Sequence, residues 1–363
     1  MSHFSRLAAL SLVSLSLSLA SLSAAQDLGV PLSWRKFSNS RPVSEIVGIS
    51  QGAIAYMFPQ LNTANAQFDG IGYWQSGNVW ASMANHDYRA GSTGYYSQVV
   101  PQLNNAFSLY ENYDEWGAVT QDAANAGRIS TKTPSFQGTC DGESMVGGVF
   151  WRAETGDMSI NSVTTGLYLT LSAYLAEATG DAKYTDAAIR SANWIRNVNM
   201  RDDYIVLDSV VATDCSRSAA GWLFTYNSGK FIEGLNVLAD VTGDASWKSL
   251  GAYVANAAMK TTAWQGSDGV ITEGASPDSN NDGVGFKSIL LRALDEAYNR
   301  RQGDNEALRI LIHSYVCVQF NALLDLAATG YTYSSAWAGP PQGFTTWGQM
   351  AALDVLVAAI HAA

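Results

Sequence analysis

The sequence predicts an all-α fold built from helical hairpins in tandem, and three observations support this class. Apolar residues recur every three or four positions along most of the chain, as one buried helix face requires. No stretch alternates polar and apolar residues for more than a few positions, so long strands are not expected. Similar glycine-containing turns separate the helical stretches.

The apolar periodicity defines ten helices. The clearest includes Val163, Leu167, Leu171 and Tyr174, which share one helix face. In chain order, the predicted helices are 43–61, 73–88, 98–110, 163–178, 185–198, 227–241, 246–259, 284–298, 306–327 and 346–360.

The turns at 90–94, 178–181, 241–244 and 301–304 share one design. Each has a glycine suited to a left-handed helix end, followed by Asp, Ser or Thr as the next N-cap. Gly180, Gly243 and Gly303 follow one another at 63 and 60 residues, whereas Gly91 and Gly180 are 89 residues apart. That interval is too long for one repeat and too short for two, and its part 123–148 is predicted to be a long loop.

The first 25 residues are predicted to be a secretory signal peptide, which leaves 26–363 as a single domain. Arg6 precedes an apolar run at 7–19, and Ser23-Ala24-Ala25 supplies small residues for cleavage. The run is too short and too rich in serine to span a membrane. We therefore expect a secreted protein, extracellular or in the cell wall, without a membrane anchor.

Composition favours a neutral ligand. The net charge is -11, with 47% apolar and 15% charged residues. This charge argues against nucleic acid, because few cations are available to neutralise phosphates, and against an anionic membrane surface. We expect a monomer with a large core.

Three cysteines remain after the signal peptide, and an exported protein favours a disulfide. Cys140 and Cys215 lie in loop-like sequence and are the favoured pair. Cys317 lies in an apolar helical run and is interpreted as a buried free thiol.

No metal or cofactor site is predicted. The histidines are scattered, and no phosphate or dinucleotide motif is present. The segment 278–283 resembles the start of a calcium loop, but its twelfth position is Ile289 rather than Glu. We interpret it as an acidic turn that caps the next helix.

Aromatic residues near predicted helix ends favour a glycan groove, because flat rings stack on the C–H faces of sugars. Core packing is the alternative for each of them. The set comprises Tyr73, Trp74, Trp80, Trp116, Trp151, Trp222, Tyr226, Trp264, Trp337 and Trp347. Candidate loop carboxylates are Asp114, Glu115, Asp141, Glu143, Asp202, Asp203, Asp208 and Asp214.

Five motifs then occur in the order seen in glycoside hydrolase family 76, the α-1,6-mannanases and related fungal cell-wall proteins. They are Gly-Gly-Val-Phe-Trp at 147–151, Thr-Gly-Leu at 165–167, Ala-Thr-Gly-Asp at 178–181, Tyr-Asn-Ser-Gly at 226–229 with Glu-Gly at 233–234, and Asp-Gly-Val-Gly-Phe-Lys at 282–287. The resemblance covers about 43–360. It implies an (α/α)6 barrel, an α-mannan partner and substrate contacts from Trp74, Trp151, Tyr226 and Asn227.

One departure concerns catalysis. The family carries adjacent aspartates in an Asn-Asp-Asp-x-x-Trp-Trp type of motif ahead of the Gly-Gly-x-x-Trp loop. They resemble a nucleophile and an acid/base for retaining hydrolysis. No such motif stands here, so the catalytic residues stay unassigned, with Asp114 and Glu115 as weak stand-ins. The barrel is predicted to lack about one helical hairpin, through a genuinely shortened chain or a gene model that skips an exon.

Two functions follow. The first is an endo-α-1,6-mannanase-like hydrolase acting on fungal wall mannan. The alternative is a non-catalytic glycan-binding or wall-associated protein, which needs the aromatic groove but no carboxylate pair. A lyase for uronic acids is disfavoured, since 32 acidic residues outnumber 21 basic ones.

Overall fold

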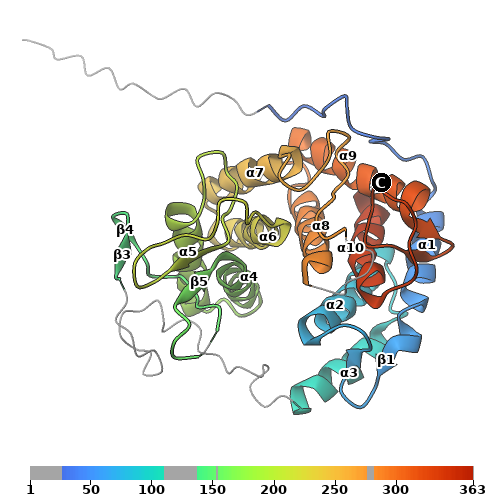
Figure 1. Ribbon diagram of the computed structural model, residues 1–363, viewed down its shortest axis with the longest axis horizontal. Helices are drawn as coiled ribbons and strands as arrows, with labels where there is room; N and C mark the ends of the chain where they lie inside the picture. Colours follow the sequence, from blue (N-terminus) through green and yellow to red (C-terminus); the bar gives the residue numbers. More distant parts are fainter. Residues whose placement is uncertain (1–26, 110–136, 153, 276–281, 363) are drawn as a thin grey trace, which may run out of the picture.

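The computed structural model describes residues 27–109, 137–152, 154–275 and 282–362 (Figure 1). These residues contain ten α-helices, the predicted number. They are α1 Val43–Ala55, α2 Tyr73–Ala90, α3 Tyr96–Leu109, α4 Ser162–Thr179, α5 Ala182–Val198, α6 Thr225–Thr242, α7 Ala245–Lys260, α8 Asp282–Arg300, α9 Glu306–Ala322 and α10 Thr346–Ala362.

Strands in the described residues are short, as predicted. Four antiparallel two-stranded ribbons occur: β1 Leu61–Asn62 with β2 Gln67–Phe68, β3 Thr139–Cys140 with β4 Glu143–Ser144, β5 Ser159–Asn161 with β6 Ser209–Val211, and β7 Ala328–Thr329 with β8 Thr332–Tyr333. The β3–β4 ribbon lies within the segment predicted as a long loop. Residues 123–136 of that segment lie outside the described residues.

The predicted helix punctuation is confirmed in full at 178–181 and 241–244, and the glycine helix end is also confirmed at Gly91. Gly91, Gly180 and Gly243 end α2, α4 and α6 with φ of 60°, 68° and 69°, the left-handed region that glycine enters without steric cost. The side chains of Asp181 and Asp244 then accept hydrogen bonds from backbone amides in the first turns of α5 and α7. The turns at 178–181 and 241–244 therefore close one helix and start the next. At 301–304 the predicted cap is wrong, because Asn305 rather than Asp304 caps α9.

One predicted boundary is wrong. The helix predicted at 43–61 ends at Ala55, and a short 3-10 helix, Phe58–Gln60, follows. Pro59 explains the break, because its ring cannot donate the backbone hydrogen bond that a continuing helix requires.

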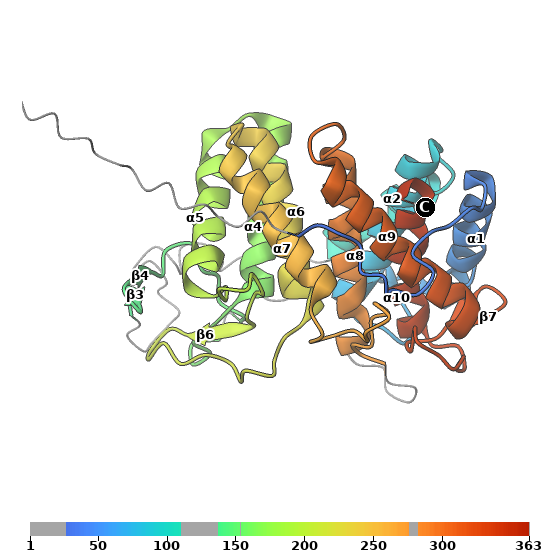
Figure 2. The same cartoon turned by 90° about the horizontal axis from the view of Figure 1, so that it is seen from above.

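The helices form an (α/α)6 barrel that lacks one hairpin among the described residues. The inner helices pack in the order α4, α6, α8, α10 and α2, with α5, α7, α9 and α1 outside them (Figures 1 and 2). No comparable packing joins α2 to α4. We call this side of the ring, bounded by α2 and α4, the open side. Residues 110–136, between α3 and β3, lie outside the described residues.

Burial follows this arrangement. Every residue from Thr225 to Ala239 in α6 is buried, whereas Leu167 and Leu171 on α4 are about half exposed, and Tyr88 on α2 is 74% exposed. By length and composition, Glu306–Ala327 is apolar enough to cross a membrane, but 67% of its most apolar window is buried within the fold. We interpret that segment as a core helix.

Candidate glycan-binding site

A cavity of about 430 Å³ lies where the N-terminal parts of four inner helices meet. We call it the aromatic pocket. Its lining residues are Trp74, Gly77 and Asn78 of α2, Trp151 of the loop before β5, Val163 and Leu167 of α4, Tyr226 and Lys230 of α6, and Asp282, Phe286, Ile289 and Arg292 of α8. The volume lies within the usual range for small-molecule sites.

Stacked rings form one wall of the aromatic pocket. The rings of Tyr226 and Phe286 are stacked with centroids 4.0 Å apart, and Phe286 is also stacked with Trp74 at 6.3 Å. The indole of Trp74 remains 37% exposed, so part of its ring is available to a ligand. This wall presents the kind of flat apolar surface that sugar rings stack on.

Contacts with α8 hold Trp74 in place. Its Nε1 donates a hydrogen bond to Oδ1 of Asp282 at 3.3 Å, and Nε2 of Gln75 donates to the same oxygen at 2.7 Å. A Cβ on Gly285 would stand 3.1 Å from the indole, so glycine leaves the space that this side chain occupies. Asp282 thereby orients the ring and also places a carboxylate at the pocket.

Trp151 reaches the aromatic pocket because the loop before it packs tightly on α5. Gly147 has φ of 105°, and a Cβ there would stand 2.2 Å from the carbonyl oxygen of Arg190. A Cβ on Gly148 would stand 2.7 Å from Nε1 of Trp194. Only glycine fits at these positions, and the chain leaves them with Trp151 46% exposed at the pocket.

A buried hydrogen-bond network lies behind Tyr226. Its hydroxyl donates to Oδ1 of Asp208 at 3.2 Å, and Nδ2 of Asn227 donates to the same oxygen at 3.1 Å. Burial, with a smaller contribution from Asp208, raises the pKa of Tyr226. The phenol therefore stays protonated, and the network fixes the ring against the pocket.

Lys287 and Glu273 support the wall from behind. Nζ of Lys287 donates to the carbonyl oxygens of Glu273 at 2.8 Å and Ser335 at 2.6 Å. The Glu273 carboxylate accepts a hydrogen bond from the backbone amide of Thr225 at 3.0 Å, at the start of α6. Burial raises the pKa of Glu273 and lowers the pKa of Lys287. This pair anchors the first turns of α6 and α8, which carry Tyr226 and Phe286.

The structure brings three of the four predicted substrate contacts together. Trp74, Trp151 and Tyr226 all line the aromatic pocket. Asn227 is fully buried and binds Asp208 instead of lining the pocket. Its position one residue after Tyr226 on a buried helix explains this, because consecutive helical residues point in different directions.

The other aromatic residues divide between core and surface. Trp80, Trp264, Trp337 and Trp347 are buried, which agrees with the core-packing alternative. Trp222 is 55% exposed, and its ring lies 6.4 Å from that of Phe224. Trp116 lies outside the described residues.

Among the described residues that line the aromatic pocket, Asp282 is the single carboxylate. The sequence pattern predicted an acidic turn there, although Asp282 also begins the motif at 282–287. In the structure it is the first residue of α8. Asp208 lies behind Tyr226. Asp141 and Asp203 form ion pairs with Arg217 and Arg201 on loops, away from the lining residues. The stand-ins Asp114 and Glu115 lie outside the described residues.

The predicted disulfide is confirmed. Cys140 of β3 and Cys215, after β6, are joined across 75 residues of sequence, and Cys317 is free and buried. Burial raises the pKa of the Cys317 thiol to about 12, which keeps it protonated and unreactive. In the part of the chain that the structure describes, no three acidic, histidine or cysteine side chains are grouped as metal ligands.

Curated relatives are mannan-degrading enzymes of yeasts. The mannan endo-1,6-alpha-mannosidase of Candida albicans is 24% identical over 340 residues, covering 78% of this chain and 72% of the relative. That of Saccharomyces cerevisiae is 24% identical over 260 residues, covering 61% and 57%. That of Candida glabrata is 26% identical over 208 residues, covering 48% and 47%. The chain thus spans about half the length of the last two relatives.

Solved structures share the fold at low sequence identity. One is an inactive variant of the alpha-1,6-mannanase GH76A of Salegentibacter sp. HEL1_6, with two consecutive aspartates replaced by alanine, in complex with alpha-1,6-mannotetrose. It has a TM-score of 0.71 and 17% identity, covering 88% of this chain and 99% of the other. Dfg5 from Chaetomium thermophilum, in complex with glucosamine, has a TM-score of 0.68 and 16% identity, covering 90% and 92%.

The family assignment rests on sequence. The model of glycosyl hydrolase family 76 matches residues 135–362, which is more than half of the chain. The match includes Trp151, Tyr226 and Asp282. This protein therefore belongs to glycosyl hydrolase family 76.

Proposed function

We propose that this chain is a secreted family 76 protein that binds α-1,6-linked mannan of fungal cell walls in the aromatic pocket. The observation that carries the proposal is the convergence of Trp74, Trp151 and Tyr226, from three distant segments, on one cavity. Their rings supply stacking surfaces, and Asn78 and Asp282 supply polar groups for hydroxyls. The net charge of -11 suits a neutral polysaccharide.

Secretion belongs to the same proposal. Residues 1–25 act as the signal peptide, 26–363 form one domain, and the mature chain works as a monomer outside the cell or in its wall. The sequence pattern at the N-terminus and the confirmed disulfide support this, because disulfides persist in oxidising compartments.

Retaining hydrolysis of α-1,6-mannoside links is the second candidate, and family membership favours it. Glycoside hydrolysis commonly needs two carboxylates flanking the scissile bond. Among described residues the aromatic pocket supplies Asp282, and Asp114 and Glu115 are the remaining stand-ins. With one carboxylate among the described residues of the pocket, binding is the function that the geometry supports best.

Calorimetric titration with α-1,6-mannotetraose tests binding. Trp74→Ala removes a stacking surface and is expected to weaken binding about tenfold. Tyr96→Ala is the control, because Tyr96 is an exposed aromatic residue of α3 outside the aromatic pocket. Equal affinities for the parent and Trp74→Ala would refute the proposed site.

Incubation with α-1,6-mannan and α-1,6-mannobiose, followed by mass spectrometry of released sugars, tests hydrolysis. The parent is expected to bind without releasing sugar. Release by the parent but not by an Asp114→Ala/Glu115→Ala double variant would establish that pair as catalytic. Release that disappears in Asp282→Asn would assign a catalytic role to Asp282. Either result replaces binding alone with hydrolysis.

A further inference from the structure

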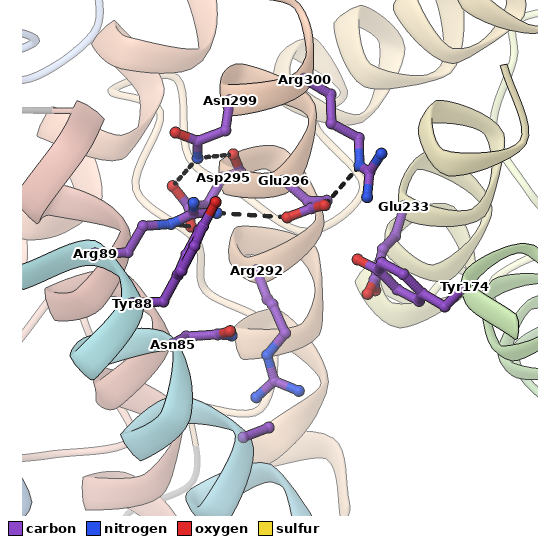
Figure 3. Close-up of a pocket in the computed structure, with 11 residues that line it drawn as sticks. Asn85, Tyr88, Arg89, Tyr174, Glu233, Arg292, Asp295, Glu296, Asn299 and Arg300 are labelled. Carbon is purple, nitrogen blue, oxygen red and sulfur yellow. Dashed lines mark hydrogen bonds and ion pairs between the residues drawn. The ribbon is translucent and has the colours of Figure 1, made fainter. Parts of the chain in front are cut away.

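A second cavity, of about 640 Å³, lies further along the same inner helices. We call it the polar pocket (Figure 3). It is lined by Ala81, Asn85, Tyr88 and Arg89 of α2, Tyr174 of α4, Glu233 of α6, and Arg292, Asp295, Glu296, Asn299 and Arg300 of α8. It borders the open side, and in a complete ring a sixth inner helix would stand between α2 and α4.

The polar pocket adjoins the aromatic pocket. Arg292 lines both cavities. Its guanidinium donates to Oδ1 of Asn78 at 2.7 Å and to Oδ2 of Asp354 at 2.8 Å, so the side chain is held at the junction. Trp74 and Tyr88 both belong to α2, and a rise of about 1.5 Å per residue separates them by about 21 Å along the helix.

Charges in the polar pocket balance. Among its lining residues, three carboxylates face three guanidinium groups. Arg89 pairs with Asp295 at 2.8 Å, and Arg300 pairs with Glu296 at 2.6 Å. An ionic ligand would have to displace one partner of a formed pair. A neutral polyhydroxylated ligand can accept from the guanidinium groups and donate to the carboxylates without displacing either.

Aromatic rings flank these polar groups. Figure 3 shows Tyr88 on α2 and Tyr174 on α4 at opposite sides of the cavity, with the charged side chains of α8 between them. Tyr88 is 74% exposed, and the Arg89 guanidinium lies over one face of its ring, 5.0 Å from the centroid, which leaves the other face for stacking. Burial raises the pKa of Tyr174, so its hydroxyl stays a hydrogen-bond donor. Two rings beside a network of fixed donors and acceptors match the chemistry of a saccharide.

We propose that the polar pocket is a second saccharide subsite adjoining the aromatic pocket, so that a long neutral oligosaccharide occupies both cavities. The inference rests on the proposed binding of α-mannan. It goes further in extending the binding surface beyond Arg292 along the barrel axis. A disaccharide occupies only the aromatic pocket, whereas a hexasaccharide reaches Tyr88 in the polar pocket.

Calorimetry with α-1,6-mannobiose and α-1,6-mannohexaose on the mature chain tests the proposal. Tyr88→Ala is expected to weaken hexaose binding about tenfold and to leave biose binding unchanged. Because Tyr88 is mostly exposed, its replacement by alanine removes few packing contacts. Tyr88→Phe should retain parental affinity, because the ring remains. Trp74→Ala should weaken both ligands, and Tyr96→Ala neither.

The outcomes separate the two proposals. If Tyr88→Ala binds hexaose as the parent does while Trp74→Ala weakens it, the second subsite is refuted and the aromatic pocket stands. If Tyr88→Ala weakens biose and hexaose equally, the residue does not act as a distal subsite, and the inference is also wrong. If the parent binds neither ligand, both proposals fail.

Discussion

Helices α4 and α6 are both 18 residues long and end in the same kind of glycine cap, yet their environments differ. α6 packs between α4 and α8, and its first fifteen residues are all buried. Among the described residues, α4 has an inner neighbour on one side only, and its Leu167 and Leu171 are about half exposed. In the part of the chain that the structure describes, an apolar helix face is therefore buried where the ring supplies a neighbour, whereas Leu167, next to the open side, lines the aromatic pocket.

The largest expected effect concerns the disulfide, which joins β3 to the segment after β6 on the α4 side of the opening. Replacing both cysteines, Cys140→Ala/Cys215→Ala, frees a 75-residue loop in the unfolded chain. We expect a loss of about 4 kcal/mol in the free energy of unfolding, measured by urea denaturation. Cys317→Ala, which breaks no cross-link, is the control. An unchanged urea midpoint in the double variant would show that packing alone holds this side.

Two leucines of α4 compare its packed and open faces directly. Leu169 is fully buried against Gly234 of α6, whereas Leu171 is 57% exposed. Leu169→Ala should cost about 3 kcal/mol of unfolding free energy through the cavity it leaves. Leu171→Ala should change it by less than about 0.5 kcal/mol. A cost of several kcal/mol for Leu171→Ala would mean that the open side is covered in solution.

Two glycines allow the same comparison of a packed face with an open face. Their replacement by alanine is expected to change the unfolding free energy in opposite directions. A Cβ on Gly229 of α6 would stand 3.0 Å from the backbone of Leu290 in α8, whereas a Cβ on Gly77 of α2 meets nothing within 4 Å among the described residues. Gly229→Ala should lower the unfolding free energy by about 2 kcal/mol through overpacking. Gly77→Ala should raise it by about 0.5–1 kcal/mol through higher helix propensity. Thermal melts of the pair check this, and a destabilised Gly77→Ala variant would contradict an open α2 face.

The smallest expected effect lies on the packed face of α2 and depends on pH. His86 is fully buried beside Tyr95, and its Nδ1 lies 3.9 Å from Oδ1 of Asp87. Burial lowers the pKa of His86, against weaker opposite effects of Asp87 and the Val47 backbone. The unfolded chain takes up the proton below a pH of about 6.5, while the folded chain resists it, so stability falls as the pH falls.

His86→Phe removes this titration and keeps a ring against Tyr95. Between pH 7.5 and 5.5 the parent should lose about 1 kcal/mol more unfolding free energy than the variant. Urea titrations at the two pH values measure the difference, with His313 and His361 present in both proteins. Equal losses of unfolding free energy in the two proteins would show that burial does not lower the pKa of His86 in the folded chain.

The local features were readable from the sequence. Gly180 and Gly243 predicted helix ends because glycine, which has no Cβ, adopts the left-handed conformation of a helix C-terminus without steric cost. The apolar periodicity predicted the helices, but it did not predict that the first helix ends at Ala55, ahead of Pro59. The spacing from Gly91 to Gly180 indicated the irregular repeat that the structure displays as the open side between α2 and α4.

The direction in which each side chain points from its helix was less predictable. Tyr226 and Asn227 are adjacent in one motif, yet one lines the aromatic pocket and the other is buried against Asp208. Asp282 was assigned to a turn because its sequence context does not reveal that Trp74, more than 200 residues earlier, donates to it. Both outcomes depend on which helices become neighbours.

The helical class, most of the caps, the cysteine pair and the aromatic residues suited to a glycan could be predicted from the amino-acid sequence, because these depend on local conformation and side-chain chemistry. Which of these side chains line a pocket depends on how helices distant in the sequence pack together. The tertiary structure joined Trp74, Trp151 and Tyr226 in one pocket and placed Tyr88 opposite Tyr174 in another. The physical reason is that the ring sets helix neighbours through contacts between distant residues, and those contacts fix each helix's rotation about its own axis.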